Sequence, residues 1–504
     1  MCGIVVAFEP KKHRSPPYLP TQTLAHRGPD GISVNVVETQ TARVSFGHTR
    51  LATHATSSIQ PLKHGGWTYV VNGEIYTRND CHVIGQVLHL GKQAPLALDG
   101  VFAFVAYHPE HGILAARDPI GVVPLFVGAR GNIIYFASEI KALAHCNWAM
   151  IFPPGTVYDG TFHQYKPNYT IPSAIASPTE IRPLLENAVQ KRLNMNCPWG
   201  VLLSGGLDST IIAKCVSQCI RPAGYPVIHT FSIGLEGSPD LEMAAKVARE
   251  LGTCHHPVVY TVEEGLATIP AVIGAVETYD VTTIRASVPM YLLARVIRRS
   301  GVKVVLSGEG ADELFAGYAY NKFAPSPEAL GEECIRKMDT LHAYDCARAN
   351  KSCAAHGVEC RVPFLDKQVV DWAMNVLHPS QKMWKQIEKE VLRDNFPDLP
   401  AGVAQRKKAQ FSDAVGSAWI DACRKLPCGE SEYYQNIFDA LFPDRRACAM
   451  TDYNSRACSS GAAASWVSHC IPDPSGHLVA SETRGIDASL RPTPLQGSVG
   501  VRTE

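Results

Sequence analysis

The sequence lacks an excess of either charge, a long apolar run and the pattern of a secretory leader. Lys plus Arg and Asp plus Glu number 47 each, so no net field attracts nucleic acid or an anionic membrane. No uninterrupted apolar stretch is long enough to span a bilayer. Basic residues and prolines occupy positions 11–17, where a leader would have its hydrophobic core. We therefore expect a cytosolic protein that binds neither nucleic acid nor membranes.

The cysteines do not form the framework of a small secreted protein. There are 16 of them, scattered over 504 residues, which favours a reducing compartment. The run Cys254-His255-His256 resembles a fragment of a metal site. Because no second ligand cluster follows at zinc-like spacing, we interpret it as the end of a strand.

The chain length and the order of its patterns predict two domains and no internal repeat. Residues 2–165 consist of short strand-like runs with turn signals, such as "CGIVVAF", "WTYVVNGEIY" and "GVFAFVAYH", and predict antiparallel sheets. A Pro-rich linker at 166–179 follows. In residues 180–470 buried strands alternate with long helices, which predicts a doubly wound parallel sheet. The Ser/Thr/Pro/Gly-rich segment 471–504 predicts a disordered tail.

The stretch "GVLLSGGLDST" places a glycine-rich turn between a buried strand and a helix. Gly205 and Gly206 allow a tight turn whose N–H groups surround an anion, and the helix N-terminus adds positive charge. No Gly-Lys-[Ser/Thr] follows, so this is not the usual P-loop. Ser204 and Ser209 can bond phosphate oxygens, whereas Asp208 beside phosphates requires a cation such as Mg²⁺.

A second glycine-rich turn, "VKVVLSGEGADELFAGY", follows another apolar strand about a hundred residues later. It supplies Ser307, Gly308, Glu309 and a second candidate metal ligand, Asp312. In a parallel sheet both turns lie at the carboxyl ends of strands, where ligands bind. Together the two motifs resemble the ATP-pyrophosphatase family. That resemblance implies ATP cleavage between the α- and β-phosphates and adenylation of a carboxylate.

Three further stretches narrow the resemblance: "ETYDVTTIRASVPMY", "ARANKSCAAHGVECRVPFLD" and "QRKKAQFSDAVG". They are similar to the glutamine-hydrolysing asparagine synthetases, in which the β-carboxylate of aspartate receives AMP. The resemblance implies aspartate binding by Thr282, Thr283 and Arg285, contact of the aspartyl adenylate with Glu309, and nucleotide contacts from Leu203 and Ile233. It assigns the adenylate or ammonia step to Lys408 and Arg361, with Lys407 as the alternative register for Lys408.

An adenylated aspartate requires a nitrogen nucleophile. Cys2, which directly follows Met1, can supply it as ammonia by hydrolysing the amide of glutamine. Amide hydrolysis by a thiol needs a base, and a terminal amine with a pKa of ~7.7–8.0 can serve. The amine and the thiol belong to one residue once Met1 is removed. A buried cysteine on a strand is the alternative reading.

The motifs "HRGPDG", "GHTRLATH", "VNGEIY" and "FASEIKAL" resemble the class II glutamine amidotransferases, an N-terminal-nucleophile α+β sandwich. In that reading Asn72 and Gly73 stabilise the oxyanion, at ~3–4 kcal/mol per donor. The glutamine-binding residues are Arg50, Leu51, Ala52, Thr53, His54, Asn72, Gly73, Glu74 and Asp80.

One segment departs from the family pattern. In the family a helical stretch separates "NGEIY" from a Gly-Ser-Asp turn, whereas here "NGEIYTRNDCHVI" brings Asp80 almost directly after it. Either the pocket closes without that stretch, or the sequence as given lacks a segment.

These features predict a two-site ligase that uses glutamine, aspartate and ATP with Mg²⁺, and a homodimer is our expectation. Three alternatives stay open: an ammonia-dependent synthetase with an impaired glutaminase, a relative that forms another amide or a β-lactam, and a non-catalytic regulator that binds glutamine or ATP. Phosphoribosyl and sugar amidotransferases lack "SGGLDS".

Overall fold

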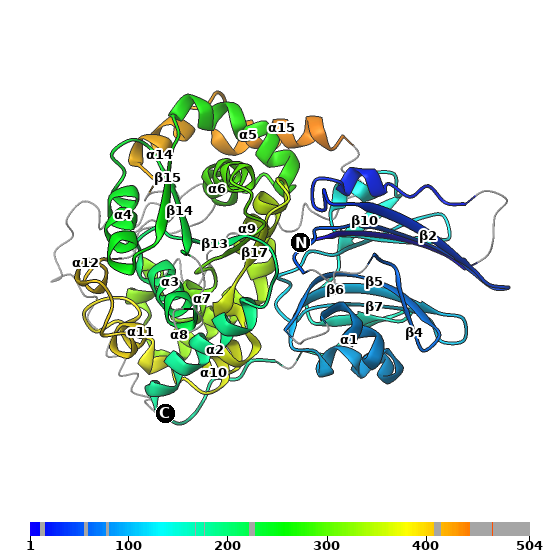
Figure 1. Ribbon diagram of the computed structural model, residues 1–504, viewed down its shortest axis with the longest axis horizontal. Coiled ribbons are helices and arrows are strands. Elements are labelled where there is room, and N and C mark those ends of the chain that lie inside the picture. The colour runs from blue at the N-terminus through cyan, green and yellow to red at the C-terminus, as the bar shows by residue number, and fades with distance from the viewer. Residues whose placement is uncertain are drawn as a thin grey trace, which may run out of the picture.

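The structure is a computed structural model that describes residues 1–10, 16–54, 59–76, 80–166, 168–175, 177–220, 227–407, 415–443 and 466. The predicted tail at 471–504 and Lys408 lie outside the described residues. In Figure 1 the N-terminal sheets lie on one side and the helix-rich second half on the other.

The N-terminal half consists of two six-stranded antiparallel sheets. The first has the order β10-β8-β9-β1-β3-β2, with β1 (Gly3–Glu9), β2 (Ile32–Glu38), β3 (Arg43–Thr49), β8 (Phe126–Arg130), β9 (Ile133–Ala137) and β10 (Trp148–Ile151). The second has the order β12-β11-β7-β6-β5-β4, with β4 (Leu62–His64), β5 (Trp67–Ile75), β6 (Gly100–His108), β7 (Gly112–Arg117), β11 (Thr156–Tyr158) and β12 (Phe162–Gln164).

Alternation along β5 explains how the second sheet is buried on both faces. Val70 belongs to the core shared with the first sheet, whereas Tyr69 and Val71 belong to a separate core on the other face. Helix α1 (Asp80–Val87) and the 3₁₀ segment η2 (Leu88–Ala97) contribute Ile84 and Leu88 to that second core. The strands stack as two layers in Figure 1.

The second half contains a five-stranded parallel sheet in the order β15-β14-β13-β16-β17. Its strands are β13 (Trp199–Leu202), β14 (His229–Gly234), β15 (Cys254–Val259), β16 (Val304–Leu306) and β17 (Glu359–Arg361). Along the chain, β14 and β15 are added on one side of β13, and β16 and β17 are then added on its other side. This reversal places a ligand crevice at the carboxyl end of β13.

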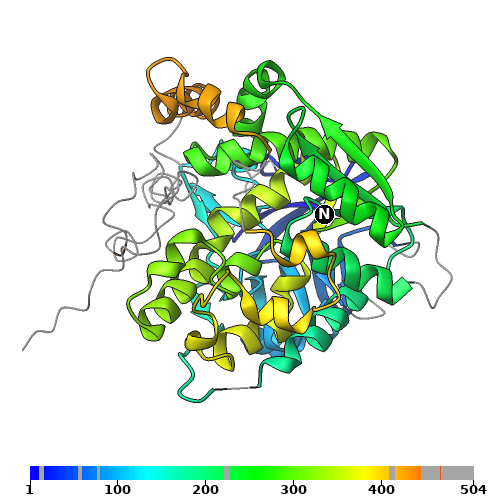
Figure 2. The ribbon, with the colours of Figure 1, turned by 90° about the vertical axis from the view of Figure 1, so that its left-hand side faces the viewer.

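Helices lie on both sides of the parallel sheet, with α3 and α4 against β13 and β14, and α6 and α9 against β14 and β17 (Figure 1). Figure 2 shows this half of the chain from the side that faces away from the N-terminal sheets. The helices of this half are α2 (Ile181–Arg192), α3 (Leu207–Ile220), α4 (Pro239–Leu251), α5 (Val262–Val276), α6 (Val281–Arg299), α7 (Ala311–Leu314), α8 (Pro327–Thr340), α9 (Asp345–Ala354), α10 (Lys367–Asn375), α11 (Glu390–Asn395), α12 (Ala401–Ala404), α14 (Ser417–Arg424) and α15 (Glu430–Leu441). Short 3₁₀ segments are η1 (Thr21–Leu24), η3 (Ile140–Leu143), η4 (Pro178–Glu180), η6 (Ala319–Phe323), η7 (Leu341–Ala343), η8 (Pro363–Leu365) and η9 (Pro379–Gln381).

The predicted fold class, antiparallel sheets followed by a doubly wound parallel sheet, is confirmed by this topology. No helix in the described ranges is both long and apolar enough to cross a bilayer.

Candidate active sites

Cys2 lies immediately before β1, and its thiol is held by the neighbouring chain. The Leu51 N–H donates to Cys2 Sγ at 3.4 Å, and Arg27 Nε donates to the Cys2 carbonyl at 2.9 Å. Burial raises the pKa of the Cys2 thiol and outweighs the nearby terminal ammonium, which lowers it. That ammonium belongs to Met1 and pairs with buried Glu359 at 3.2 Å. With Met1 in place, the raised pKa keeps the thiol of the half-buried Cys2 protonated near neutral pH.

Asn72 and Gly73 lie in β5, and Ser138 connects Asn72 to the start of β1. Asn72 Nδ2 donates to Ser138 Oγ at 3.4 Å, and the Ile4 N–H donates to the same oxygen at 3.0 Å. Asn72 Oδ1 is buried without a hydrogen-bond partner among the described residues. Gly73 has φ +129°, and an added Cβ would lie 2.1 Å from the Val101 carbonyl oxygen. Only glycine fits at position 73. Ser138 lies within the motif "FASEIKAL", but no local pattern marks its contact with Asn72.

Glu74 lies at the centre of the residues predicted to bind glutamine. Thr53 Oγ1 donates to its carboxylate at 3.5 Å, and His54 Nε2 lies 3.4 Å from it. Arg361 of the second half is 3.0 Å from the same carboxylate. The structure therefore places Arg361 at the boundary between the two halves.

The other residues predicted to bind glutamine occupy the segment beside Cys2. The Arg50 N–H donates to the Gly31 carbonyl at 2.8 Å, and the Ala52 N–H donates to Asp30 Oδ2 at 2.8 Å. Leu51 is buried. Asp80 is the first residue of α1, and its side chain lies outside the described set.

A pocket opens at the carboxyl ends of the parallel strands and gathers most of the residues predicted for ATP and aspartate. Those that line it are Leu203, Ser204, Gly206, Asp208, Ser209, Ile233, Thr282, Ser307, Gly308, Glu309 and Asp312. Lys407, the alternative to Lys408, also lines this pocket.

The turn before α3 is shaped by the residues that the sequence motif contains. Gly205 has φ +71°, and an added Cβ would lie 2.6 Å from the Ala244 nitrogen. Ser204 and Ser209 join their hydroxyls at 3.1 Å, and the Gly206 N–H donates to Ser204 Oγ at 3.3 Å. The local contacts thus hold the turn closed around the N-terminus of α3.

Lys389 is the most prominent residue that the sequence analysis missed. Its ammonium lies 2.7 Å from Asp208 and 2.6 Å from Asp312, the two candidate metal ligands. It is nearly fully buried and has φ +56°, so the backbone is held in an uncommon conformation to deliver it. Lys389 directly precedes α11, and no local pattern distinguishes it from the nearby Lys382 and Lys385.

Glu309 is oriented by Arg348 of α9, whose guanidinium lies 2.7 Å from the Glu309 carboxylate and 2.8 Å from Asp345. Burial disfavours the charged guanidinium, but these two carboxylates hold the pKa of Arg348 above its ordinary value. Arg348 lies within "ARANKSCAAHGVECRVPFLD", where no local pattern marks it as part of the site.

Glu313, which also lines the pocket, has a pKa raised to about 8 by burial and then by the charges of Asp345 and Asp312. Its carboxyl is bonded by the Tyr318 hydroxyl. Near neutral pH this side chain is therefore protonated and adds no charge to the pocket.

Three predicted residues of the aspartate and adenylate steps are absent from the described pocket lining. Thr283 donates to Asp280 as part of the cap of α6. Arg285 is buried and paired with Glu430 of α15. Arg361 pairs with Glu74 and, at 2.7 Å, with Glu359.

A buried ionic network joins the two halves of the chain near Cys2. Arg27, which bonds the Cys2 carbonyl, lies 2.7 Å from Glu139, and Lys141 lies 2.8 Å from the same carboxylate. Burial alone would raise the pKa of Glu139, but the charges of Lys141 and Arg27 hold this pKa well below its usual range. Glu277 accepts the Lys141 N–H at 2.8 Å and pairs with Lys351 at 2.6 Å. The arrangement fixes the two sites relative to one another.

Known protein families match the N-terminal half and the second half of the chain separately. The Asparagine synthase family matches residues 180–328 and 321–428, and two Glutamine amidotransferase domain families match residues 1–82 and 76–145. The chain is 41% identical to asparagine synthetase (glutamine-hydrolysing) 2 of Oryza sativa, over 92% of this chain and 90% of the relative. It is 39% identical to asparagine synthetase B (glutamine-hydrolysing) of Escherichia coli, over 95% of this chain and 99% of the relative.

The rice alignment extends over 536 positions, more than the 504 residues of this chain. The relative therefore contains segments that this chain lacks.

Proposed function

The chain belongs to the family of glutamine-hydrolysing asparagine synthetases, and from that premise we propose which residues carry each half of the reaction. It is a carbon–nitrogen ligase, EC 6.3.5.4, that uses ATP to make asparagine from aspartate with glutamine as nitrogen donor.

In the first site Cys2 is the nucleophile, after removal of Met1 has made its α-amine the chain terminus. The amine takes the thiol proton, and the thiolate attacks the glutamine amide carbon to form a tetrahedral intermediate. The protonated amine returns that proton to the leaving nitrogen, ammonia departs, and water hydrolyses the remaining glutamyl thioester to glutamate and the free thiol. Asn72 Nδ2 and the Gly73 N–H stabilise the oxyanion. The enforced glycine at position 73 and the link from Asn72 through Ser138 to β1 support this assignment.

Arg50 and Glu74 hold the two charged ends of glutamine, with Leu51, Ala52, Thr53 and His54 around them. The contacts of Thr53 and His54 with Glu74 support a pocket built on that carboxylate. Asp80 remains a proposed ammonium ligand.

In the second site the residues that bind ATP are Leu203, Ser204, Gly205, Gly206, Ser209, Ile233, Ser307 and Gly308. Thr282, which lines the pocket, binds aspartate, and Thr283 and Arg285, held by Asp280 and Glu430, fix the start of α6 beside it. The turn around Ser204 presents hydroxyls and N–H groups suited to phosphate oxygens. Glu309, oriented by Arg348, contacts the aspartyl adenylate, while Lys408 acts at the adenylate or ammonia step. Arg361 pairs with Glu74 and Glu359 and is therefore not retained in that role.

Asp208 and Asp312 are proposed to hold Mg²⁺, which would neutralise phosphate charge when bound. Both carboxylates already surround the Lys389 ammonium at 2.6–2.7 Å, so the site is built for a cation and its oxygen donors suit magnesium. Lys389, whose ammonium lies between these two carboxylates, would then be available to bond pyrophosphate oxygens.

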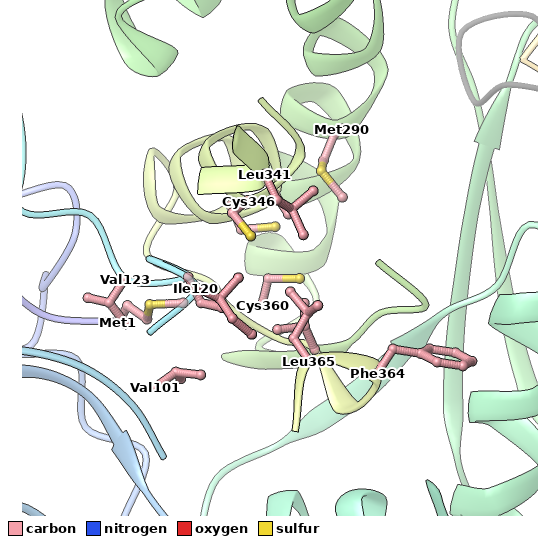
Figure 3. Packing of buried hydrophobic residues seen from close by; sticks show 14 of the residues in the cluster. Met1, Val101, Ile120, Val123, Met290, Leu341, Cys346, Cys360, Phe364 and Leu365 are labelled. Carbon is pink, nitrogen blue, oxygen red and sulfur yellow. The ribbon is translucent and has the colours of Figure 1, made fainter. Parts of the chain in front are cut away.

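The observation that carries the proposal is a continuous set of buried apolar side chains between the two sites. Figure 3 shows Met1 beside Ile120 and Val123, followed by Cys360, Leu365, Leu341 and Cys346, and then Met290, which lines the nucleotide pocket. Met1 is 4% exposed, so its removal leaves space at the Cys2 end of this set. Neutral ammonia crosses such surroundings without being protonated by bulk water.

The shortened segment after β5 favours a second candidate, an ammonia-dependent synthetase with an impaired glutaminase. Asp80 follows Ile75 by five residues, and the rice relative contains segments that this chain lacks. In that case the second site forms and consumes the aspartyl adenylate as before, and ammonium replaces glutamine as the nitrogen source.

The two candidates differ in their nitrogen source. We measure asparagine, AMP and pyrophosphate formed by the purified chain and by Cys2→Ala, with glutamine or with an ammonium salt. We expect Cys2→Ala to lower the glutamine-dependent rate at least about 1,000-fold and to leave the ammonium-dependent rate unchanged. A wild-type chain that is active only with ammonium supports the second candidate. No pyrophosphate with either source contradicts both.

We also propose the division into domains at 2–165 and 180–470, a homodimer and a cytosolic location. The 13 cysteines in the described ranges are all free thiols, which supports a reducing compartment.

A further inference from the structure

The amino ends of β14 and β15 bring together three side chains that the ligase reaction does not use. His229, Cys254 and His256 each offer a metal-binding atom, and these atoms lie within 4.8 Å of one another. We propose that these three residues bind Zn²⁺, with a thiolate and two imidazoles as ligands. This goes beyond the proposed function, because the site is separate from both reaction sites.

The register of the two parallel strands explains the convergence. His229 is paired with Cys254, and Phe231 is paired with His256. Alternate residues of a strand point to one face, so His229, Cys254 and His256 share the same face of the sheet. The sequence analysis dismissed this fragment because no second cluster follows at zinc-like spacing. The third ligand comes from the neighbouring strand, and His229 and His256 are 27 positions apart.

The separations suit a tetrahedral zinc ion. Ideal bond lengths place two imidazole nitrogens about 3.3 Å apart, and a nitrogen and a thiolate sulfur about 3.6 Å apart. His229 Nδ1 and His256 Nε2 are 2.9 Å apart, and Cys254 Sγ is 3.6 Å from His256 Nε2. Binding therefore requires the two imidazoles to separate by a few tenths of an ångström.

The surroundings orient the ligands and leave one position open. Phe231 stacks on the His256 ring, with centroids 4.8 Å apart and planes 17° apart, which fixes the imidazole. Cys254 is exposed, so water can complete the coordination. Neighbouring His255 points to the other face and bonds Thr230 and Ser232 at 3.0 Å, so it is not a competing ligand.

The position of the site indicates what the metal does. Both strands begin here, whereas the nucleotide pocket lies at the carboxyl ends of the same sheet. β15 is an edge strand and pairs only with β14 among the described strands. A zinc ion bonded to both strands ties this edge to the sheet, so it stabilises the second half without entering the reaction.

Cobalt(II) titration of the full-length, metal-free chain tests the proposal, because cobalt occupies zinc sites and reports thiolate ligands by a charge-transfer band. The wild-type chain should develop that band at one equivalent and lose it when Zn²⁺ is added. Cys254→Ser should abolish the band, and His229→Gln should weaken binding at least tenfold. Cys428→Ser, which alters another exposed cysteine, is the matched control and should keep it.

A separate cluster of His108, Glu110 and His111 can bind metals but has no sulfur, so it cannot produce the band. Zn²⁺ should also raise the thermal midpoint of the wild-type chain and of Cys428→Ser, but not that of Cys254→Ser. Unchanged ammonium-dependent activity shows that each variant is folded. A band that is absent from the wild type, or that persists in Cys254→Ser, overturns the proposal.

Discussion

The ammonium of Lys389 balances the charges of two carboxylates in the nucleotide pocket. This ammonium is shared by Asp208 and Asp312, so removing it leaves two carboxylates side by side at the mouth of the nucleotide pocket. We infer that Lys389 keeps this pair assembled before ATP binds and then contributes positive charge to the leaving group.

Lys389→Met should therefore lower pyrophosphate formation about 100-fold or more, equally with glutamine and with ammonium. Lys385→Met is the matched control, since Lys385 is exposed and lies four positions earlier. Initial rates of pyrophosphate release in the presence of aspartate provide the measurement. A loss under threefold in Lys389→Met would remove Lys389 from the account.

The raised pKa of Glu313 leads us to expect that ATP binding depends on pH. This pKa is raised to about 8, first by burial and then by Asp345 and Asp312. The neutral form therefore persists up to about pH 8, and ionisation above it adds a negative charge that repels the triphosphate. The KM for ATP should rise about tenfold between pH 7 and pH 9, which corresponds to ~1–2 kcal/mol for one nearby charge.

Glu313→Gln stays neutral throughout and should show no such rise. The comparison requires the KM for ATP at several pH values, with the concentration of unprotonated ammonia held constant. An identical rise in wild type and variant would show that another group titrates.

At the scale of elements, β5 illustrates how one strand serves both the core and the first site. Its side chains alternate between two apolar cores, and its path at Gly73 brings the backbone against β6. Because φ is +129° and an added Cβ would meet the Val101 carbonyl oxygen at 2.1 Å, alanine would push the two strands apart.

Gly73→Ala should abolish glutamine hydrolysis while the ammonium-dependent rate stays within about twofold of wild type. Gly65→Ala is the control for a positive φ alone, since Gly65 has φ +54° but its added Cβ would meet nothing within 4 Å. Glutamate release measures the first activity and asparagine formation from ammonium measures the second. Retention of half of the hydrolysis by Gly73→Ala would contradict the proposed oxyanion geometry.

The elements were largely predictable because their signals are local. The apolar run "PWGVLL" predicts a strand, and the apolar positions of "DLEMAAKVARELG" predict a helix. The structure has β13 and α4 at these places, and the predicted turn between Ser204 and Ser209 precedes α3. The pattern of "VPMYLLARVIRRSG" predicts a helix from Val288. The observed helix α6 begins earlier, at Val281, because Asp280 caps it by accepting the Thr283 N–H at 2.8 Å.

Contacts between distant segments could not be predicted in this way. Lys389 meets Asp208 across 181 positions, and Arg361 turns to Glu74 rather than to the nucleotide pocket. Each of these pairings depends on the three-dimensional path of the chain. Composition and spacing contain no signal for them.

At the scale of the whole molecule, the account depends on two sites that act as one. The network through Glu139 and Glu277 fixes the two halves relative to one another, and the apolar set from Met1 to Met290 connects the sites. Nitrogen released at Cys2 should therefore reach the adenylated aspartate without mixing with the solvent.

The most direct test of this central claim uses glutamine labelled with ¹⁵N in its amide, supplied together with an excess of unlabelled ammonium. Mass spectrometry of the asparagine gives the labelled fraction. The account predicts that asparagine is labelled far above the ¹⁵N content of the ammonia in solution, and that Cys2→Ala removes the label. Asparagine whose label equals that of the dissolved ammonia would contradict it.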